Sequence, residues 1–307
     1  MRVLAKLASF AAVLLVVLGV AFFVGRSSGI DGEAAARSAH VADNDAHAAE
    51  AGDGGHAEVD HETGPASEPG GLQVAADGYT FEPLTYPADA GLEDLFEFRI
   101  VGPDGAAVTN FATEHNADLH LIVVNRDLSD YQHVHPELSA DGTWSIPLTL
   151  AKAGAYRAFA DFTPAGSDDG LTLGTDLLVA GEFEPQPLPA PTHIADVDGY
   201  TVELGGDLTP GTASPVTLTV SRDGEPVTDL QPYLGAYGHL VALRERDLAY
   251  LHVHPEGDPD DPSTPPGPAV SFVTEVPSEG GYRLYLEFQH EGTVHRAEFT
   301  VETSHDD

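Results

Sequence analysis

The sequence predicts an all-β protein: two tandem immunoglobulin-like antiparallel β-sandwiches that follow an N-terminal transmembrane helix and a disordered linker. Three observations predict this fold. The chain repeats itself, each repeat consists of short runs rich in Val, Thr, Tyr and Phe, and turn dipeptides such as DG and GG separate these runs. Repeats of about 110 residues built from such strands are typical of the immunoglobulin-like sandwich.

The internal repeat defines the predicted domains. The segment LHLIVVNRDLSDYQHVHPE at 119–137 returns as GHLVALRERDLAYLHVHPE at 238–256, and DGYTFE returns as DGYTVE. The predicted segments are a signal anchor or transmembrane helix over 1–24, a disordered acidic, histidine-containing linker over 25–71, a first β-sandwich over 72–182, a proline-rich linker over 183–192 and a second β-sandwich over 193–303.

The N-terminal segment indicates export. Residues 7–24 are uncharged and follow Arg2 and Lys6. As a helix this run would be about 27 Å long, enough to cross the core of a bilayer. Basic residues before it and acidic residues after it orient the N-terminus inside. We expect a single-pass cell-membrane protein with extracytoplasmic domains, or a secreted protein if the segment is a cleaved signal peptide.

Composition excludes several classes of function. The chain has 50 acidic and 13 basic residues and a net charge of −37, which disfavours nucleic acid as a partner. It has no cysteine, so disulfides, thiolate zinc sites, iron–sulfur clusters and cysteine nucleophiles are excluded. The one methionine is the initiator, which excludes thioether copper sites. Histidines, carboxylates and backbone carbonyls remain as metal ligands.

Histidine spacing predicts a metal site in each repeat. An ungapped alignment of 100–137 with 219–256 leaves 14 of 38 positions identical, and three histidines are among them. The second and third histidines follow the first by 13 and 15 residues in both copies: His120, His133 and His135, and then His239, His252 and His254. Three imidazoles that converge can bind zinc or copper(II).

The hairpin geometry supports convergence. A turn centred near residues 127–128 would place His120 opposite His135, while His133 and His135 project from one face of their strand. Pro136 and Pro255 are expected to end the strands and to stop further pairing. The alternative is structural histidines that hydrogen-bond to polar groups of a packed interior, because His120 has the same strand parity as apolar neighbours.

Four residues are weaker candidates. Asp161 and Glu287 occupy equivalent positions before a Phe, so either could supply a carboxylate ligand, or both could be solvent-facing acids. His290 and His295 flank an EGT turn in the second copy alone and could form a surface pair, or be exposed turn residues.

The anchor, the tandem repeats and the two HVHPE hairpins resemble the bacterial exported, membrane-anchored YtkA-like, immunoglobulin-like proteins associated with heavy-metal or copper transport. The resemblance covers about residues 72–303. It implies extracytoplasmic metal handling and points to the matching histidines, His120, His133, His135, His239, His252 and His254. The lack of internal methionine departs from many periplasmic copper(I) carriers.

These observations together predict a membrane-tethered protein that binds copper(II) or zinc at two equivalent histidine sites, for buffering or delivery. Its expected partners are metal ions, the membrane through its N-terminal helix, and a metal transporter or another exported protein. The alternative is a non-enzymatic interaction or structural module. No enzyme is expected, because no Ser/His/Asp arrangement, phosphate-binding glycine loop or HExxH motif is present.

Overall fold

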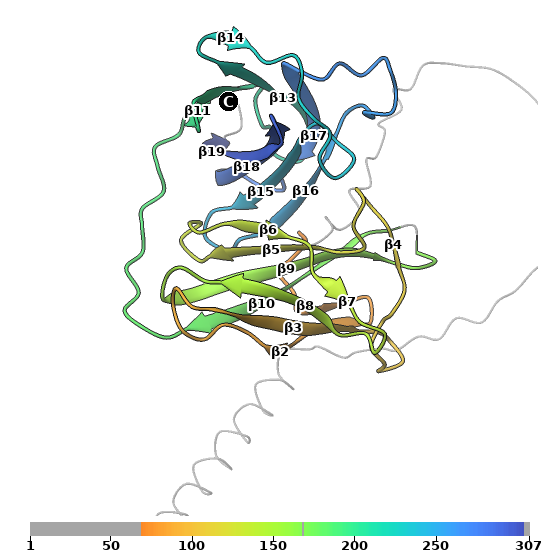
Figure 1. Ribbon diagram of the computed structural model, residues 1–307. Coiled ribbons are helices and arrows are strands. Elements are labelled where there is room, and N and C mark those ends of the chain that lie inside the picture. The colour runs from red at the N-terminus through yellow and green to blue at the C-terminus, as the bar shows by residue number, and fades with distance from the viewer. Residues whose placement is uncertain (1–68, 168, 304–307) are drawn as a thin grey trace, which may run out of the picture. The chain divides into compact units, whose positions relative to one another are not determined.

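The computed structural model describes residues 69–167 and 169–303, and the regular structure in them is all β-strand (Figure 1). In this part of the chain no helix has the length and apolar character needed to cross a bilayer. The predicted transmembrane helix lies outside the described residues, as does the predicted linker except for residues 69–71. Gly71 in that short remainder donates its amide to the carbonyl of Thr172.

Nineteen strands follow one another along the described chain, β1–β10 in the first sandwich and β11–β19 in the second. Their bounds are β1 Ala75–Ala76, β2 Tyr79–Thr85, β3 Glu93–Val101, β4 Phe111–Ala112, β5 His120–Asn125, β6 Gln132–Val134, β7 Glu137–Leu138, β8 Trp144–Thr149, β9 Gly154–Pro164, β10 Leu171–Val179, β11 Ile194–Val197, β12 Tyr200–Gly205, β13 Ala213–Arg222, β14 Glu225–Pro226, β15 His239–Arg244, β16 Tyr250–Pro255, β17 Ala269–Glu275, β18 Gly280–His290 and β19 Thr293–Thr303.

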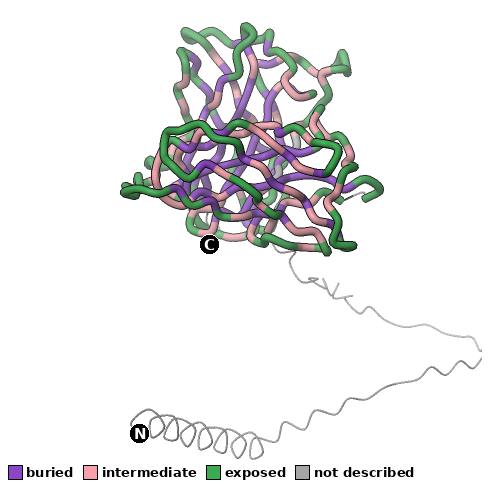
Figure 2. The backbone as a smooth tube through the Cα atoms, turned by 60° about the horizontal axis from the view of Figure 1, so that its bottom comes forward, coloured by how far each residue is buried: buried purple, intermediate pink, exposed green. Residues whose placement is uncertain are grey.

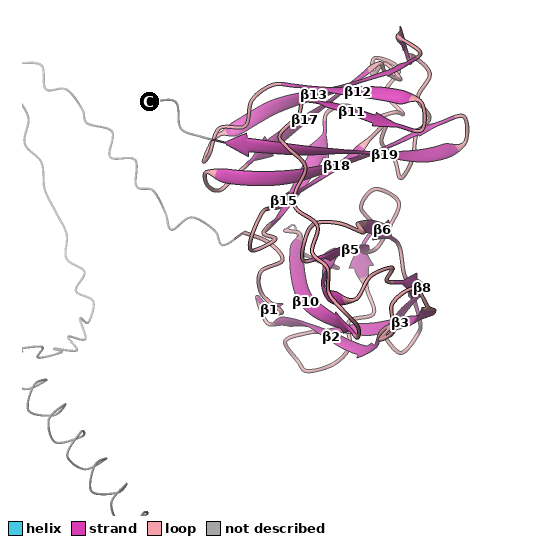
Figure 3. Ribbon diagram, turned by 90° about the vertical axis from the view of Figure 1, so that its left-hand side faces the viewer, coloured by secondary structure: helices cyan, strands magenta, loops and turns pink. Residues whose placement is uncertain are grey.

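The first sandwich has two antiparallel sheets. One has the order β1-β2-β3-β8-β7 and the other β10-β9-β5-β6, with β4 paired to β9. Figure 3 shows β1, β2, β3 and β8 on one side of this sandwich and β5, β6 and β10 on the other. Strands β2-β3-β8-β7 and β10-β9-β5-β6 match the two-sheet order of an immunoglobulin-like domain. Alternate residues of β3, including Phe96 and Phe98, are fully buried between the sheets. The prediction of antiparallel β-sandwiches is therefore confirmed.

The second sandwich repeats most of these strands but joins its two sheets. Its order is β11-β12-β13-β17-β16-β15-β18-β19, because β16 pairs with β15 along its first part and with β17 at its end. Pro255 ends the strand, as expected, but it lies opposite Phe272 in the other sheet. The expectation that the prolines stop further pairing is thus wrong for the second copy, since Pro lacks an amide donor but still offers a carbonyl.

Figure 2 shows buried residues, in purple, running through the middle of the described chain. All six residues of strand β5 are buried, so this strand is covered on both faces. Leu121 and Val123 belong to the core between the two sheets of the first sandwich. Ile122 and Val124 belong to a separate cluster that includes Tyr285 and other residues of the second sandwich. A continuous apolar run is the expected pattern for a strand covered on both sides.

The second face of β5 is covered by the second sandwich, and the described residues all belong to one compact unit. Tyr131 stacks on Tyr285 with ring centroids 3.9 Å apart, and Phe159 packs on Tyr250 at 5.4 Å. The repeat relates Tyr131 to Tyr250 in sequence, so the two contacts are pseudo-symmetric. The Tyr285 hydroxyl also donates to the carbonyl of Leu128, at 2.7 Å. This interface is where histidines of the two copies meet.

Candidate metal centre

The β5–β6 hairpin positions the first triad, which is His120, His133 and His135. The second triad is His239, His252 and His254. Its register pairs Ile122 with His133, so His120 lies opposite His135, as the sequence predicted. The connecting turn is closed by the amide of Asn125, which donates to the carbonyl of Ser129. Rings at these positions lie on the face of the hairpin that meets the second sandwich.

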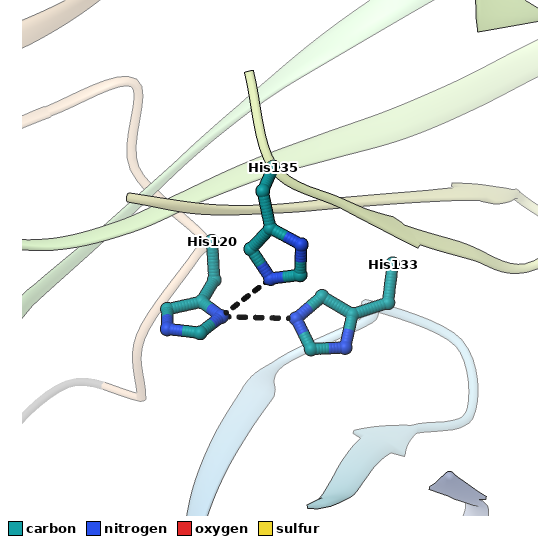
Figure 4. A group of neighbouring side chains, drawn as sticks. All are labelled: His120, His133 and His135. Atoms are coloured by element: carbon teal, nitrogen blue, oxygen red, sulfur yellow. Dashed lines mark hydrogen bonds between the residues drawn. The ribbon is translucent and has the colours of Figure 1, made fainter. Parts of the chain in front are cut away.

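Figure 4 shows the three rings of the triad pointing toward one another. Nδ1 of His120 lies 3.0 Å from Nε2 of His133 and 3.1 Å from Nε2 of His135. One nitrogen from each of the three rings falls within 4.8 Å of the others. The structure therefore brings together the three histidines that the first repeat predicted as ligands.

We call a ring nitrogen inner where it faces the other two rings and outer where it points away from them. In two of these rings the outer nitrogen already donates a hydrogen bond. Nε2 of His120 donates to the carbonyl of Glu114 at 3.2 Å, and Nδ1 of His133 donates to Oε2 of Glu287 at 2.8 Å. A carbonyl or carboxylate oxygen only accepts, so each neutral ring keeps its lone pair on the inner nitrogen. Two lone pairs then face each other across 3.0 Å, and an added proton or a metal ion is needed to make that approach favourable.

The triad has the dimensions of a metal site. Zinc bonds to imidazole nitrogen at about 2.0–2.1 Å, which in tetrahedral geometry separates two nitrogens by about 3.3 Å. The observed separations from His120 are a few tenths of an ångström shorter, so small ring rotations would fit an ion. A cavity of about 20 Å³ borders His120 and His133 and has room for about one water molecule.

Burial favours the neutral form of His120 and of His135. Desolvation lowers the pKa of His120 to about 4, and the neighbouring His133 lowers it further. Desolvation, again with His133, lowers the pKa of His135 to about 3. A neutral imidazole is the form that binds a metal ion, so both rings are competent as ligands at neutral pH.

The second triad is described only in part. His239 is 8% exposed, and its Nε2 donates to the carbonyl of Tyr233 at 2.7 Å. Tyr233 is the repeat equivalent of Glu114, so the first histidine of each copy is held by the same loop. His252 and His254 lie in β16, but their side chains are outside what the structure describes. Their role as ligands stays a prediction.

The first histidines of the two copies lie near one interface. The ring of His239 is 6.3 Å from that of His133 and 5.4 Å from that of His115, centroid to centroid. The sequence predicted two equivalent sites, one per sandwich. That prediction stays open for the second site, and the structure shows that His115, His133 and His239 lie close together where the HLIVV and HLVAL strands pack against each other.

The two acidic candidates contact the cluster without joining the triad. Asp161 lies opposite His120 in the β5–β9 register and accepts from Thr172 at 2.9 Å and from the hydroxyl of Tyr250 at 3.2 Å. Glu287 accepts from His133. Neither is a solvent-facing acid, since each is 7% exposed. These contacts orient the side chains that bond to the two acids: Thr172 and Tyr250 at Asp161, and His133 at Glu287.

His290 and His295 lie apart from the triad and do not form a surface pair. Both are 8% exposed, so the alternative of exposed turn residues is wrong. Nδ1 of His290 bonds to the hydroxyl of Tyr200 at 2.7 Å, and Nδ1 of His295 bonds to Asp198 at 2.9 Å. The ring of Tyr200 packs against both, with its centroid 5.6 Å from that of His290 and 4.5 Å from that of His295.

The sequence analysis did not predict three groups that surround the site. The carbonyl of Glu114 holds His120, the ring of His115 borders the cavity, and Tyr250 reaches Asp161 across the interface. The repeat gives no signal for His115, because the second copy has Leu234 at its position. Positive φ values at both residues mark the same tight turn in each copy, so this turn, rather than the side chain, is what the repeat keeps.

A protein family and several solved structures resemble the chain. The family described as Domain of unknown function (DUF8832) matches residues 73–172 and 195–305. No curated protein matches. The resemblance to YtkA-like proteins stays an expectation from the sequence.

The solved structures include the Escherichia coli adhesin FdeC, with 15% identity over 75% of this chain and a TM-score of 0.24. They also include invasin, a bacterial integrin-binding protein, with 13% identity over 74% of this chain and a TM-score of 0.22. Domains 5-6 of the S-layer protein SbsC match with 14% identity over 75% of this chain, 97% of theirs, and a TM-score of 0.23. The chain spans 65% of the FdeC structure and 39% of the invasin structure.

Proposed function

The chain belongs to the DUF8832 family, and for this member of it we propose an extracytoplasmic, membrane-tethered protein that binds copper(II) or zinc through His120, His133 and His135. The extracytoplasmic location rests on the apolar segment 7–24 and its flanking charges. The chemistry rests on the triad. Buffering of the ion, or delivery to a transporter or another exported protein, is the role that we assign to it.

One observation carries the proposal. Glu114 and Glu287 occupy the outer nitrogens of His120 and His133, so two inner lone pairs converge within 3.0 Å. Histidine ligands of metal ions commonly donate their other N–H to a carbonyl or carboxylate in this way. A divalent cation among the three inner nitrogens would replace the lone-pair repulsion by three bonds.

Three protein ligands suit an exchangeable ion better than a structural one. Structural zinc sites are closed by four protein ligands, whereas three leave a position for water or an incoming ligand. Imidazole suits both zinc and copper(II), and the absence of cysteine and internal methionine disfavours copper(I). A buffer or carrier needs an open position of this kind, because the ion must pass to another ligand.

The second candidate function is an interaction or structural module whose histidines serve the fold. It is favoured by the burial of the His120 and His133 side chains at the interface between the sandwiches, where polar groups that bond to one another also fix the packing. In this case an extra proton held between His120 and His133 would take the place of the ion.

Titration of the full-length chain with copper(II) and with zinc distinguishes the two functions. We expect at least one equivalent to bind tightly at pH 7, and the copper(II) complex to show an EPR spectrum with several coordinated imidazole nitrogens. Uptake of less than one equivalent of either ion would leave only the structural function.

A further inference from the structure

The metal site of the first sandwich takes one of its supporting groups from the second sandwich. Among the described residues, Glu287 is the sole residue of the second sandwich that hydrogen-bonds to a ring of the triad. We propose that Glu287 is a positioning residue that completes the site, so that metal affinity depends on the two sandwiches being docked. This inference rests on the proposed function.

The contact is short and shielded from water. Nδ1 of His133 lies 2.8 Å from Oε2 of Glu287, and the two side chains are 4% and 9% exposed. Hydrogen bonds to an ionised acceptor are about twice as strong as neutral ones, and burial strengthens them further. The bond therefore fixes both the orientation of the His133 ring and the nitrogen that carries its proton.

The choice of nitrogen decides whether His133 can be a ligand. With its proton on Nδ1, the ring presents a lone pair on Nε2 toward His120. Without an acceptor at Nδ1, the proton could move to Nε2 and donate to His120, at the same 3.0 Å separation. That hydrogen bond would occupy two of the three inner nitrogens, those of His133 and His120, and leave no lone pair on either for a metal ion. Glu287 therefore selects the tautomer of His133 that binds metal.

The first sandwich has an acid at the equivalent position. Asp161, the repeat equivalent of Glu287, lies opposite His120 and accepts from Thr172 and Tyr250. Glu287 lies opposite His239 in the β15–β18 register, and its side chain reaches His133 across the interface. Two rigid paired strands thus hold the carboxylate, so its position follows the docking of one sandwich on the other.

The test compares zinc affinities of full-length variants by competition with a chelator. We expect Glu287→Ala to weaken binding by about 10- to 100-fold, the range found for groups that support metal-ligating histidines. Glu287→Gln should lie between Ala and wild type, because its amide oxygen still accepts from Nδ1. The matched control is Tyr285→Phe, which removes another buried hydrogen bond across the interface, to Leu128, without touching a triad ring; its affinity should stay within about twofold of wild type.

A second measurement reports the tautomer directly. In metal-free protein, ¹⁵N NMR of the His133 ring should show the proton on Nδ1 in wild type and a shift toward Nε2 in Glu287→Ala. Unchanged affinity and tautomer in Glu287→Ala, with binding still abolished by His133→Ala/His135→Ala, would overturn the inference and leave the proposed function standing. Equal weakening by Tyr285→Phe would also overturn it, because the effect would then be general damage to the interface. Wild-type binding by His133→Ala/His135→Ala would instead overturn the proposed function.

Discussion

The two copies of the HVHPE sequence fold differently. In the first copy β6 ends at Val134, the chain leaves the strand, and β7 begins at Glu137 in the other sheet. In the second copy β16 continues unbroken to Pro255 and pairs with both sheets. The next segment of the chain also differs, since residues 257–268 form a longer loop in the second sandwich than residues 139–143 form in the first. Identical residues therefore do not guarantee identical sites.

The acids beside the two copies also differ. Asp161 and Glu287 occupy the same register, opposite His120 and His239. Glu287 is longer by one methylene and bonds to His133 of the other sandwich, and Asp161 accepts from the Tyr250 hydroxyl of the other sandwich. The two acids thus occupy equivalent backbone positions, and each hydrogen-bonds to a side chain of the other sandwich.

The largest effect is expected from removing ligands of one copy at a time. His133→Ala/His135→Ala should lower the affinity of the first site by at least about 100-fold, because two of three ligands are lost. The sequence predicts that His252→Ala/His254→Ala removes a second equivalent. Isothermal titration with zinc measures both, and His193→Ala, a histidine bonded to the carbonyl of Leu204, is the matched control.

The two double variants show whether the two copies each bind an ion. Loss of one equivalent in each would show two independent sites. Loss of one equivalent of zinc in the first variant alone would show that the histidines of β16 have a structural role and do not bind an ion. Wild-type binding by the first variant would contradict the proposed function.

The next largest effect is on the pH dependence of stability without metal. Burial lowers the pKa of His120 to about 4 and those of His135 and His239 to about 3. As the pH falls below about 6.5, the unfolded chain takes up protons that the folded protein refuses, so the free energy of unfolding decreases. The decrease should continue through about pH 4 and level off below about pH 3.

Thermal melts between pH 7 and pH 3 in the presence of a chelator measure this decrease, expected as several degrees of the melting temperature. His239→Gln and His135→Gln should each reduce the slope between about pH 6.5 and pH 4, the first testing the second copy and the second testing the first. Equal slopes in wild type and both variants would show that these rings do not control the acid sensitivity.

The smallest effect is expected from making the copies more alike. His115→Leu gives the first copy the residue that the second has at position 234. Because the ring of His115 borders the cavity but is not one of the three converging ligands, zinc affinity should change less than about threefold. A loss of tenfold or more in the chelator competition would make His115 a ligand and would break the analogy between the two copies.

Part of the fold and of the site follows from local sequence. The period of two in strands such as β3 and the turn dipeptides predict sandwiches, and the repeat predicts two of them. The register of the β5–β6 hairpin follows from its turn, which is why the opposition of His120 and His135 was predictable. The face on which the rings lie was not. Ile122 shares parity with His120, and the sequence offered only a core or solvent for that face.

The sequence by itself determined the β-strands, the repeat and the histidine spacing, because these depend on residues that are near one another in the chain. The tertiary structure decided that a second sandwich covers the histidine face of β5 and that Glu287 bonds to His133, 154 positions away. The physical reason is that docking buries the apolar residues of both inner strands and brings their polar neighbours with them. Strand periodicity marks such residues as buried, but it does not encode the partner that buries them.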